Sequence, residues 1–299
     1  MRIDLNIRAW QWILLVCLAF IWGASFILMK RGLQSFTGMQ VGAMRIFFSF
    51  LFFLPLIFRN AGKINKYNLR SLLIVAFIGN TIPAFLFATA QTRIDSSLAG
   101  ILNSLTPIFT MLIGMMLYAN KIRWLSIGGL MLGLAGAAGL ILSAGNVSVE
   151  TSDNRYGILA VIATVCYGIN VNEIKFRLRE LDGVAIASLG FLFPGPLAGI
   201  FLLTSDYSLA ASSGEMFSSL LAVGALAFFS SFLAIIAMNI LIKFTTTLFA
   251  ASVTYIIPIF AVFWGISDGE SFLAIQVLWA LVILCGVYLV NRKKEQPVN

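Results

Sequence analysis

The side chains able to do chemistry here are few, and the most informative one lies inside an apolar stretch. Arg45 is the one charged residue well within such a stretch. A guanidinium in the hydrocarbon region costs roughly 2.5–3.5 kcal/mol on insertion scales, so it usually faces a protein interior or a water-filled cavity. In such a cavity it would pair with a carboxylate or another anion. The alternative is that Arg45 snorkels to the surface, because it lies only about two turns from the end of its stretch.

Polar and aromatic residues recur at the i, i+3, i+4 and i+7 spacing that places them on one face of a helix. Five stretches show such faces, which predicts a pocket with aromatic walls and a few polar groups that orient a ligand. With Arg45 included, the candidate substrate-binding residues are Trp22, Ser25, Arg45, Asn80, Phe87, Gln91, Asn103, Tyr167, Asn170, Thr254 and Tyr255. Each amide taken alone could instead make an interhelical hydrogen bond.

Two prolines occupy matching places in two apolar stretches. Pro107 and Pro258 each remove one helical hydrogen bond and leave a carbonyl free four residues earlier, at Asn103 and Thr254. We predict that these prolines form a pair of hinges. The alternative is that both are tolerated kinks, as prolines in membrane helices often are.

Several kinds of chemistry have no residues to carry them. The chain has no histidine, and Cys17, Cys166 and Cys285 lie singly in separate apolar runs, so we expect no metal, cofactor or disulfide framework. No Gly-x-x-x-x-Gly-Lys-Ser/Thr loop is present to bind a nucleotide. Any step that needs energy would then have to use an ion gradient, with protons as one candidate, or the gradient of a substrate.

The composition defines the elements that must position these residues. The chain of 299 residues is 60% apolar and 11% charged, whereas soluble domains are about 45–50% apolar and about 25% charged. This excludes a soluble enzyme, a disordered chain and, despite the net charge of +8, a nucleic-acid binder. A membrane-spanning helix needs about 20 mostly apolar residues. Ten such spans are predicted, at about 10–29, 38–58, 69–91, 96–118, 124–143, 156–174, 184–203, 216–240, 245–266 and 272–290.

The distribution of basic residues predicts the orientation of these spans. With the N-terminus inside, fifteen of the 20 Lys and Arg residues fall on the inner side, four fall outside, and Arg45 lies within a span. Because basic residues are enriched in cytoplasmic loops, we expect both termini to be cytoplasmic.

The two halves of the chain resemble each other. An offset of 151 matches Ala99 to Ala250, Pro107 to Pro258, Ile108 to Ile259, Phe109 to Phe260 and Gly114 to Gly265, and related offsets near 145 and 148 match other spans. We therefore predict two repeats, residues 1–148 and 149–299. Because each repeat holds five spans, the second would be inverted relative to the first, an arrangement suited to alternating access.

At this level the sequence resembles the drug/metabolite transporter superfamily, in its EamA-type branch. The resemblance rests on the run from Phe20 to Phe26, the Pro107 and Pro258 helices, Gly269-Glu270, and the glycines Gly128, Gly133 and Gly136. It implies an all-α bundle of ten transmembrane helices as two inverted five-helix repeats, with spans five and ten outside the wall of a central cavity. The sequence departs from the family pattern at Ala119-Asn120, where members of the family often have an acidic residue.

The resemblance implies a transporter of amino acids, other metabolites or toxic compounds. We expect a secondary active transporter of the cytoplasmic membrane that exports amino acids or related small metabolites by alternating access. The alternative is an uptake permease or exchanger. A membrane-embedded enzyme lacks the clustered acids or metal ligands it would need, and a channel lacks a repeated filter loop. Expected partners are the substrate and the lipid bilayer, with no nucleic acid.

Three further features are expected to be structural. Asp268 and Glu270 follow the ninth span and are expected on the surface, where they could pair with a cation. Glu173 is expected at a solvated helix end. The glycines of the fifth span predict close helix packing, either within the protomer or between protomers.

Overall fold

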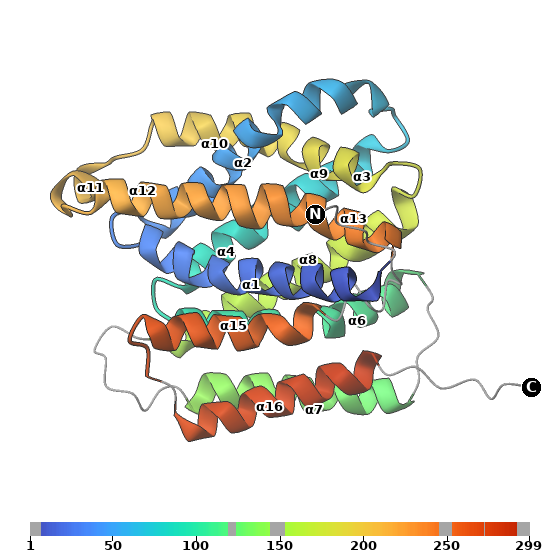
Figure 1. Cartoon of the computed structure of the whole chain (residues 1–299), viewed down its shortest axis with the longest axis vertical. Helices are drawn as coiled ribbons and strands as arrows, with labels where there is room; N and C mark the ends of the chain where they lie inside the picture. Colours follow the sequence, from blue (N-terminus) through green and yellow to red (C-terminus); the bar gives the residue numbers. More distant parts are fainter. Residues whose placement is uncertain (1–6, 119–123, 144–152, 245–252, 272, 292–299) are drawn as a thin grey trace, which may run out of the picture.

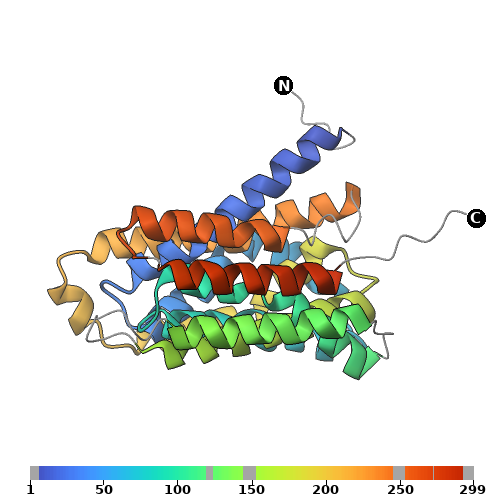
Figure 2. The same cartoon turned by 90° about the horizontal axis from the view of Figure 1, so that it is seen from below.

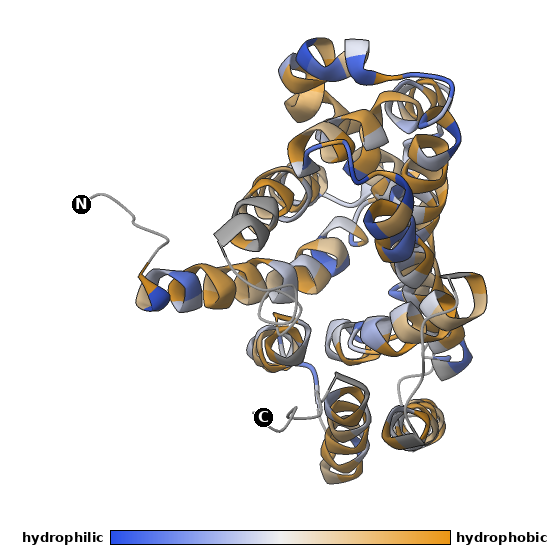
Figure 3. Cartoon of the chain, turned by 90° about the vertical axis from the view of Figure 1, so that its right-hand side faces the viewer, coloured by the Kyte–Doolittle hydropathy of each residue, from blue (hydrophilic) through white to orange (hydrophobic). Residues whose placement is uncertain are grey.

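The computed structural model describes the chain apart from residues 1–6, 119–123, 144–152, 245–252, 272 and 292–299. All regular structure in the described part is helical, and most helices run side by side along one common direction (Figure 1). Apolar residues follow these helices along most of their length, while hydrophilic segments gather at the helix ends and in the connections (Figure 3).

The first half of the chain contains the spans that the hydropathy pattern predicts. Its helices are α1 (Arg8–Gly32), α2 (Gly38–Asn60), η1 (Ala61–Lys63), α3 (Leu69–Ile74), η2 (Val75–Thr81), α4 (Ile82–Ala90), α5 (Ser96–Asn103), α6 (Thr106–Tyr118) and α7 (Trp124–Ser143). The second half continues with η4 (Asn154–Tyr156), α8 (Gly157–Arg177), α9 (Gly183–Leu192), α10 (Pro194–Leu203), α11 (Ser208–Ser212), α12 (Met216–Ala225), η5 (Leu226–Leu233), α13 (Ala234–Phe244), α15 (Val253–Ser267) and α16 (Ala274–Asn291).

Eight helical stretches of the described chain are long and apolar enough to cross a membrane, and they coincide with the first eight predicted spans to within a few residues. Two shorter apolar helices, Ile256–Ser267 and Ala274–Leu289, occupy the places of the predicted ninth and tenth spans. The all-helical membrane fold is therefore confirmed, while the number ten and the inverted arrangement stay predictions. The start of α1 and the end of α16 lie at the same end of the bundle (Figures 1 and 2).

Two spans contain a wide, π-helical segment that the sequence did not predict. η2 and η5 are both π-helical, and their first residues, Val75 and Leu226, lie 151 positions apart. Pro83 follows the first of them, and its ring clashes with the carbonyl of Gly79, four residues earlier. The matching residue after η5 is Ala234, so a proline is not what the two segments share. π-helical turns inside α-helices are rare and often accompany functional sites.

α7 and α16 form a pair of their own at the lower edge of the bundle in Figure 1. Glycines let these helices come close: a Cβ added to Gly136 would collide with Ile283 of α16, and one added to Gly139 would collide with Trp279. Gly136 and Gly139 of the fifth span thus pack within the protomer, while contact between protomers stays a prediction.

Candidate functional site

A cavity of about 300 Å³ lies between the helices, at the lower end of the range for small-molecule sites. Helices from eight of the ten predicted spans contribute to its wall, and α7 and α16 do not. This matches the arrangement that the family resemblance implies. The lining residues are Trp22, Ser25, Phe26, Met29, Arg45, Ile46, Gly79, Asn80, Phe87, Asn103, Thr106, Tyr167, Asn170, Val171, Phe191, Ser230, Ser231, Ile235, Thr254 and Ile257.

The structure brings nine of the eleven predicted substrate-binding residues to this cavity. These are Trp22, Ser25, Arg45, Asn80, Phe87, Asn103, Tyr167, Asn170 and Thr254. Gln91 does not line it: it is buried at the end of α4, and its amide has no hydrogen-bond partner among the described residues. The side chain of Tyr255 lies outside the described part of the chain.

Aromatic rings from three helices form one wall. The rings of Phe26 on α1 and Phe87 on α4 meet edge to face with centroids 5.7 Å apart. Phe87 also stacks on Tyr167 of α8 at 6.1 Å. These separations are typical of stabilising aromatic pairs. A flat or apolar part of a ligand would find its contact surface on this wall.

Arg45 supplies the positive charge of the cavity. Its Nε atom lies 3.4 Å from the Ser231 hydroxyl, and its guanidinium interacts with the Tyr167 hydroxyl. Among the described lining residues there is no aspartate or glutamate to neutralise it. The guanidinium lines the cavity and contacts η5 and α8, and its role in substrate binding stays a prediction.

Asn170 adds a hydrogen-bond acceptor. Its Oδ1 atom is buried and has no donor among the described residues. The atom rests against Gly79 of η2, where an added Cβ would lie only 2.3 Å away. A buried acceptor without a donor is unusual in native structures, which marks this contact between α8 and η2 as a place where a ligand or a water would bind.

Sequence reasoning missed the contributions of η5. Ser230 and Ser231 line the cavity 151 positions after Gly79 and Asn80, which line it from η2. The Trp22 indole N–H donates to the Ser230 carbonyl at 3.0 Å. The offset of 151 found between the proline helices would have identified both serines, whereas the offset near 148 used for these two spans paired Asn80 with Phe228.

The two predicted hinge prolines have different surroundings. Pro107 is the second residue of α6, where its missing N–H needs no partner, and the free carbonyl of Asn103 accepts a 2.8 Å hydrogen bond from the Thr106 hydroxyl. Pro258 lies inside the continuous helix α15. The fourth span is divided directly before Pro107, between α5 and α6, whereas the helix around Pro258 is continuous. Their hinge role stays a prediction.

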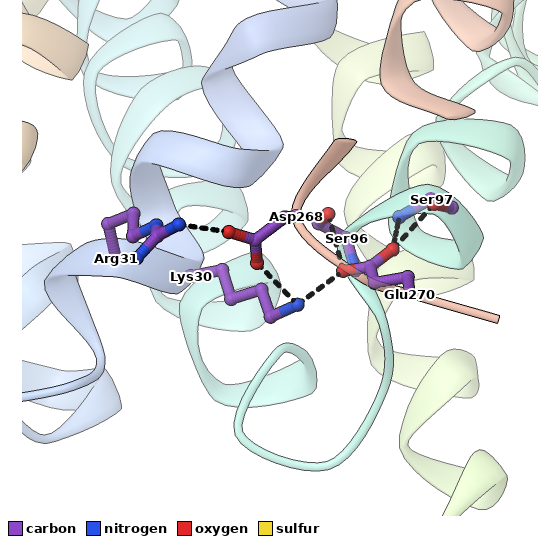
Figure 4. A network of polar contacts seen from close by, with 6 residues as sticks. All are labelled: Lys30, Arg31, Ser96, Ser97, Asp268 and Glu270. Atoms are coloured by element: carbon purple, nitrogen blue, oxygen red, sulfur yellow. Dashed lines mark hydrogen bonds and ion pairs between the residues drawn. The ribbon is translucent and has the colours of Figure 1, made fainter. Parts of the chain in front are cut away.

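At the end of α1 an ionic clamp joins three helices. We use this name for Lys30, Arg31, Ser96, Ser97, Asp268 and Glu270 (Figure 4). The Lys30 ammonium lies 2.8 Å from both Asp268 and Glu270, and Arg31 pairs with Asp268. The Glu270 carboxylate also accepts the backbone N–H groups of Ser96 and Ser97, at 2.9 and 3.0 Å, and both serine hydroxyls.

This clamp corrects the expectation of a surface role for Asp268 and Glu270. The Glu270 side chain is only 2% exposed, because Gly265 leaves room for it: a Cβ there would meet Ser97 at 1.9 Å and Glu270 at 2.3 Å. Gly269 has a φ of 87°, a conformation that favours glycine and that turns the chain between the two acids. Burial raises the pKa of Glu270, but hydrogen bonds from Lys30, Ser97 and Ser96 more than offset this and lower the pKa to about 2.

The opposite end of the bundle has its own polar contacts. The Ser71 hydroxyl on α3 donates to the Glu173 carboxylate on α8 at 2.5 Å. Glu173 is 9% exposed, so the expectation of a solvated helix end is wrong for this residue, which packs between two spans. Lys63 and Asp182 pair at 2.7 Å on the surface nearby. Within the described residues no group of three His, Cys, Asp or Glu side chains could hold a metal ion.

A bundle of apolar helices around a small polar and aromatic cavity defines a multi-pass membrane protein with a site for a small molecule. The model of the EamA-like transporter family matches residues 9–142 and, a second time, residues 155–292. The chain belongs to this family, and it contains two copies of the family's repeat.

Curated relatives and a solved structure agree with this assignment. The uncharacterized inner membrane transporter YedA of Escherichia coli K12 is 28% identical over 94% of this chain and 90% of its own. An S-adenosylmethionine/S-adenosylhomocysteine transporter of Chlamydia trachomatis serovar L2 is 25% identical over 85% of this chain and 80% of its own. A crystal structure at 14% identity, covering 95% of this chain and 96% of the other, superposes with a TM-score of 0.63, which shows a shared fold.

Proposed function

We propose that this protein is a secondary active transporter of the cytoplasmic membrane that exports amino acids or related small metabolites by alternating access. Its family and the names of its relatives indicate a transporter rather than an enzyme. The proposal includes two inverted repeats, residues 1–148 and 149–299, and hinge roles for Pro107 and Pro258. The gradient that drives it, with protons as one candidate, is for the transport assay to identify.

The observation that carries this proposal is the cavity together with the clamp beside it. Met29 lines the cavity, and the next residue, Lys30, holds the clamp. The ion pairs of Lys30 tie α1 to the chain that follows α15, and Glu270 extends the link to the start of α5. We infer that the clamp closes one end of the cavity and that its release belongs to the transport cycle.

The charge and size of the cavity support an amino acid or a close derivative as substrate. Arg45 would hold a carboxylate, the Asn170 acceptor would receive an N–H or O–H donor, and the aromatic wall would contact the rest of the molecule. The chlamydial relative is named for two compounds that both contain an α-amino acid group, which supports the same class here.

Efflux from proteoliposomes tests this function. Vesicles with purified transporter are preloaded with one radiolabelled amino acid at a time, and loss of label is compared with empty vesicles and with vesicles containing an Arg45→Ala variant. We expect a saturable efflux for a subset of amino acids that the variant loses. Absence of transport for the whole amino acid panel would overturn the substrate class.

The alternative is an uptake permease or an exchanger. The chlamydial relative is named as a transporter of two compounds. Adding unlabelled substrate to the outside distinguishes these modes, because it accelerates efflux from an exchanger and leaves a pure exporter unaffected.

The predicted topology gives a direct test. With ten spans and the basic residues inside, a fluorescent reporter and a periplasm-active phosphatase fused after residue 299 should report a cytoplasmic C-terminus. The same pair fused after Ser205, in the connection between α10 and α11, should report the outer side. A periplasmic signal at the C-terminus would contradict both the ten spans and the inverted repeats.

A further inference from the structure

A groove on the surface of the bundle, along α3 and η2, has a composition unlike that of the cavity. It is shallow and open, with a volume of about 450 Å³. Two basic residues lie at its start and apolar residues form the rest of its wall: Lys66, Arg70, Leu73, Ile74, Phe77 and Ile78. The cations and the apolar wall are therefore arranged in sequence along one groove.

The two cations are available to a ligand. Within the described part of the chain neither Lys66 nor Arg70 forms an ion pair, whereas Lys63 nearby is paired with Asp182. Among the residues that the structure describes, no aspartate or glutamate lines the groove. The Lys66 ammonium lies 5.0 Å from the ring centre of Tyr67, which is 83% exposed. Exposed tyrosines with lysines beside them are typical of the membrane–water interface.

The dimensions fit one leaflet of a bilayer. From Arg70 to Ile78 the chain rises at most about 12 Å, since 1.5 Å per residue holds for α3 and the π-helical η2 is more compressed. Half of the hydrocarbon core is about 15 Å thick. A molecule with an anionic head at Lys66 and Arg70 would place an acyl chain along Leu73, Phe77 and Ile78. Basic pockets beside membrane helices bind anionic lipid head groups in this way.

The repeat supplies an internal comparison. Lys66 and Arg70 lie nine and five residues before η2, and the residues at the same distances before η5 are Phe217 and Leu221. These two are 72% and 57% exposed, so the corresponding surface of the second repeat is apolar. The cations are thus a feature of the first repeat and not a requirement of the π-helical span.

The groove and the cavity share one π-helical segment. Phe77 and Ile78 line the groove, and the next two residues, Gly79 and Asn80, line the cavity. A lipid held against Phe77 and Ile78 would therefore stabilise the turn that positions Asn80 and that contacts Asn170.

We propose that this groove is a binding site for an anionic phospholipid and that lipid bound there supports transport through η2. The proposal that the lipid binds does not depend on the proposed function, whereas the proposed effect on transport rests on it.

Binding is tested with purified transporter in a neutral detergent, to which phosphatidylglycerol or phosphatidylcholine is added, followed by native mass spectrometry and thermal unfolding. We expect tighter binding and a higher Tm with phosphatidylglycerol. A Lys66→Gln/Arg70→Gln variant should bind it about 30-fold more weakly, given about 1 kcal/mol per basic residue. A control variant, Arg177→Gln/Arg179→Gln, removes the same charge from exposed positions at the end of α8 and should bind like the parent.

Three outcomes would overturn the site: equal binding of the two lipids, unchanged phosphatidylglycerol binding by the Lys66/Arg70 variant, or equal loss by the control. Displacement of the lipid by glycerol phosphate alone would show that only the head group is bound and that the apolar part of the groove is not used.

The effect of the lipid on transport is tested by efflux in vesicles with and without phosphatidylglycerol. Equal rates for the parent in both would overturn the regulation while the binding result stands, and lack of transport in either would instead fail the proposed function.

Discussion

We expect a Glu270→Gln substitution to open the end of the bundle that, in our proposal, the ionic clamp closes. Glutamine keeps the shape of the side chain but removes the charge that Lys30 and the serines of α5 bind. Breaking a fully buried pair costs about 3–5 kcal/mol. Because the Lys30 side chain is 34% exposed and keeps its contact with Asp268, we take the lower value. About 3 kcal/mol corresponds to roughly a hundredfold shift in the equilibrium between closed and open states.

Thiol labelling measures this shift. Cys17, Cys166 and Cys285 are replaced first, and a single cysteine then replaces Met29, which lines the cavity and is 1% exposed. A membrane-impermeant maleimide added on the clamp side should label this cysteine about a hundredfold faster in the Glu270→Gln background. Arg31→Gln is the matched control: the Arg31 side chain is 51% exposed, and exposed pairs contribute about 0–1 kcal/mol. Equal labelling in both backgrounds would show that Glu270 does not hold this end closed.

The clamp should also resist mild acid. Because the pKa of Glu270 is lowered from 4.5 to about 2, its charge stabilises the closed state fully above pH 4.5, and this contribution is lost only as the pH falls through about 2. Asp95 beside the clamp has its pKa raised by burial and by the charge of Glu270, so it takes up a proton first and relieves repulsion on Glu270. Labelling of the parent at Met29→Cys should therefore be flat from pH 7.5 to 5, after correction for maleimide reactivity. A marked rise over this range would contradict a clamp held by Glu270.

The helices were predictable because a membrane span has a local signal. Apolar runs of about 20 residues gave the ends of the first eight spans to within a few residues. Most of the predicted cavity residues could also be found from the sequence, because helical spacing alone puts Trp22 and Ser25 on one face and Tyr167 and Asn170 on another.

The clamp and the π-helical segments had no comparable signal. Lys30 and Glu270 are 240 residues apart, and a basic or acidic residue near a helix end is ordinary in any membrane protein. Their pairing depends on how α1, α5 and α15 pack, which the hydropathy pattern does not specify. The π-helical segments η2 and η5 differ from an α-helix in which backbone groups are hydrogen-bonded. This difference leaves no mark on composition or hydropathy. Ser230 and Ser231 were therefore missed, although a consistent repeat offset would have located them.

The second large effect is expected at Arg45. Replacing it with alanine removes the charge that would bind a substrate carboxylate, and hydrogen bonds to charged groups contribute about 1.5–3 kcal/mol. We therefore expect KM for a transported amino acid to rise about 10- to 100-fold. We expect the protein to stay folded, although the substitution also removes the contacts of Arg45 with Ser231 and Tyr167.

Substrate analogues separate charge recognition from general damage to the cavity. For the amino acid with the fastest parent efflux, the corresponding carboxamide lacks the negative charge, so Arg45→Ala should weaken the acid and leave the amide unchanged. Arg45→Lys should retain part of the affinity, because an ammonium keeps the charge but loses the two-pronged geometry of a guanidinium. Lys63→Gln, which breaks the exposed pair with Asp182, controls for the loss of one positive charge. If Arg45→Ala transports the acid normally at limiting concentration, the guanidinium does not bind the substrate, and the anionic group must be held by the amides and hydroxyls that line the rest of the cavity.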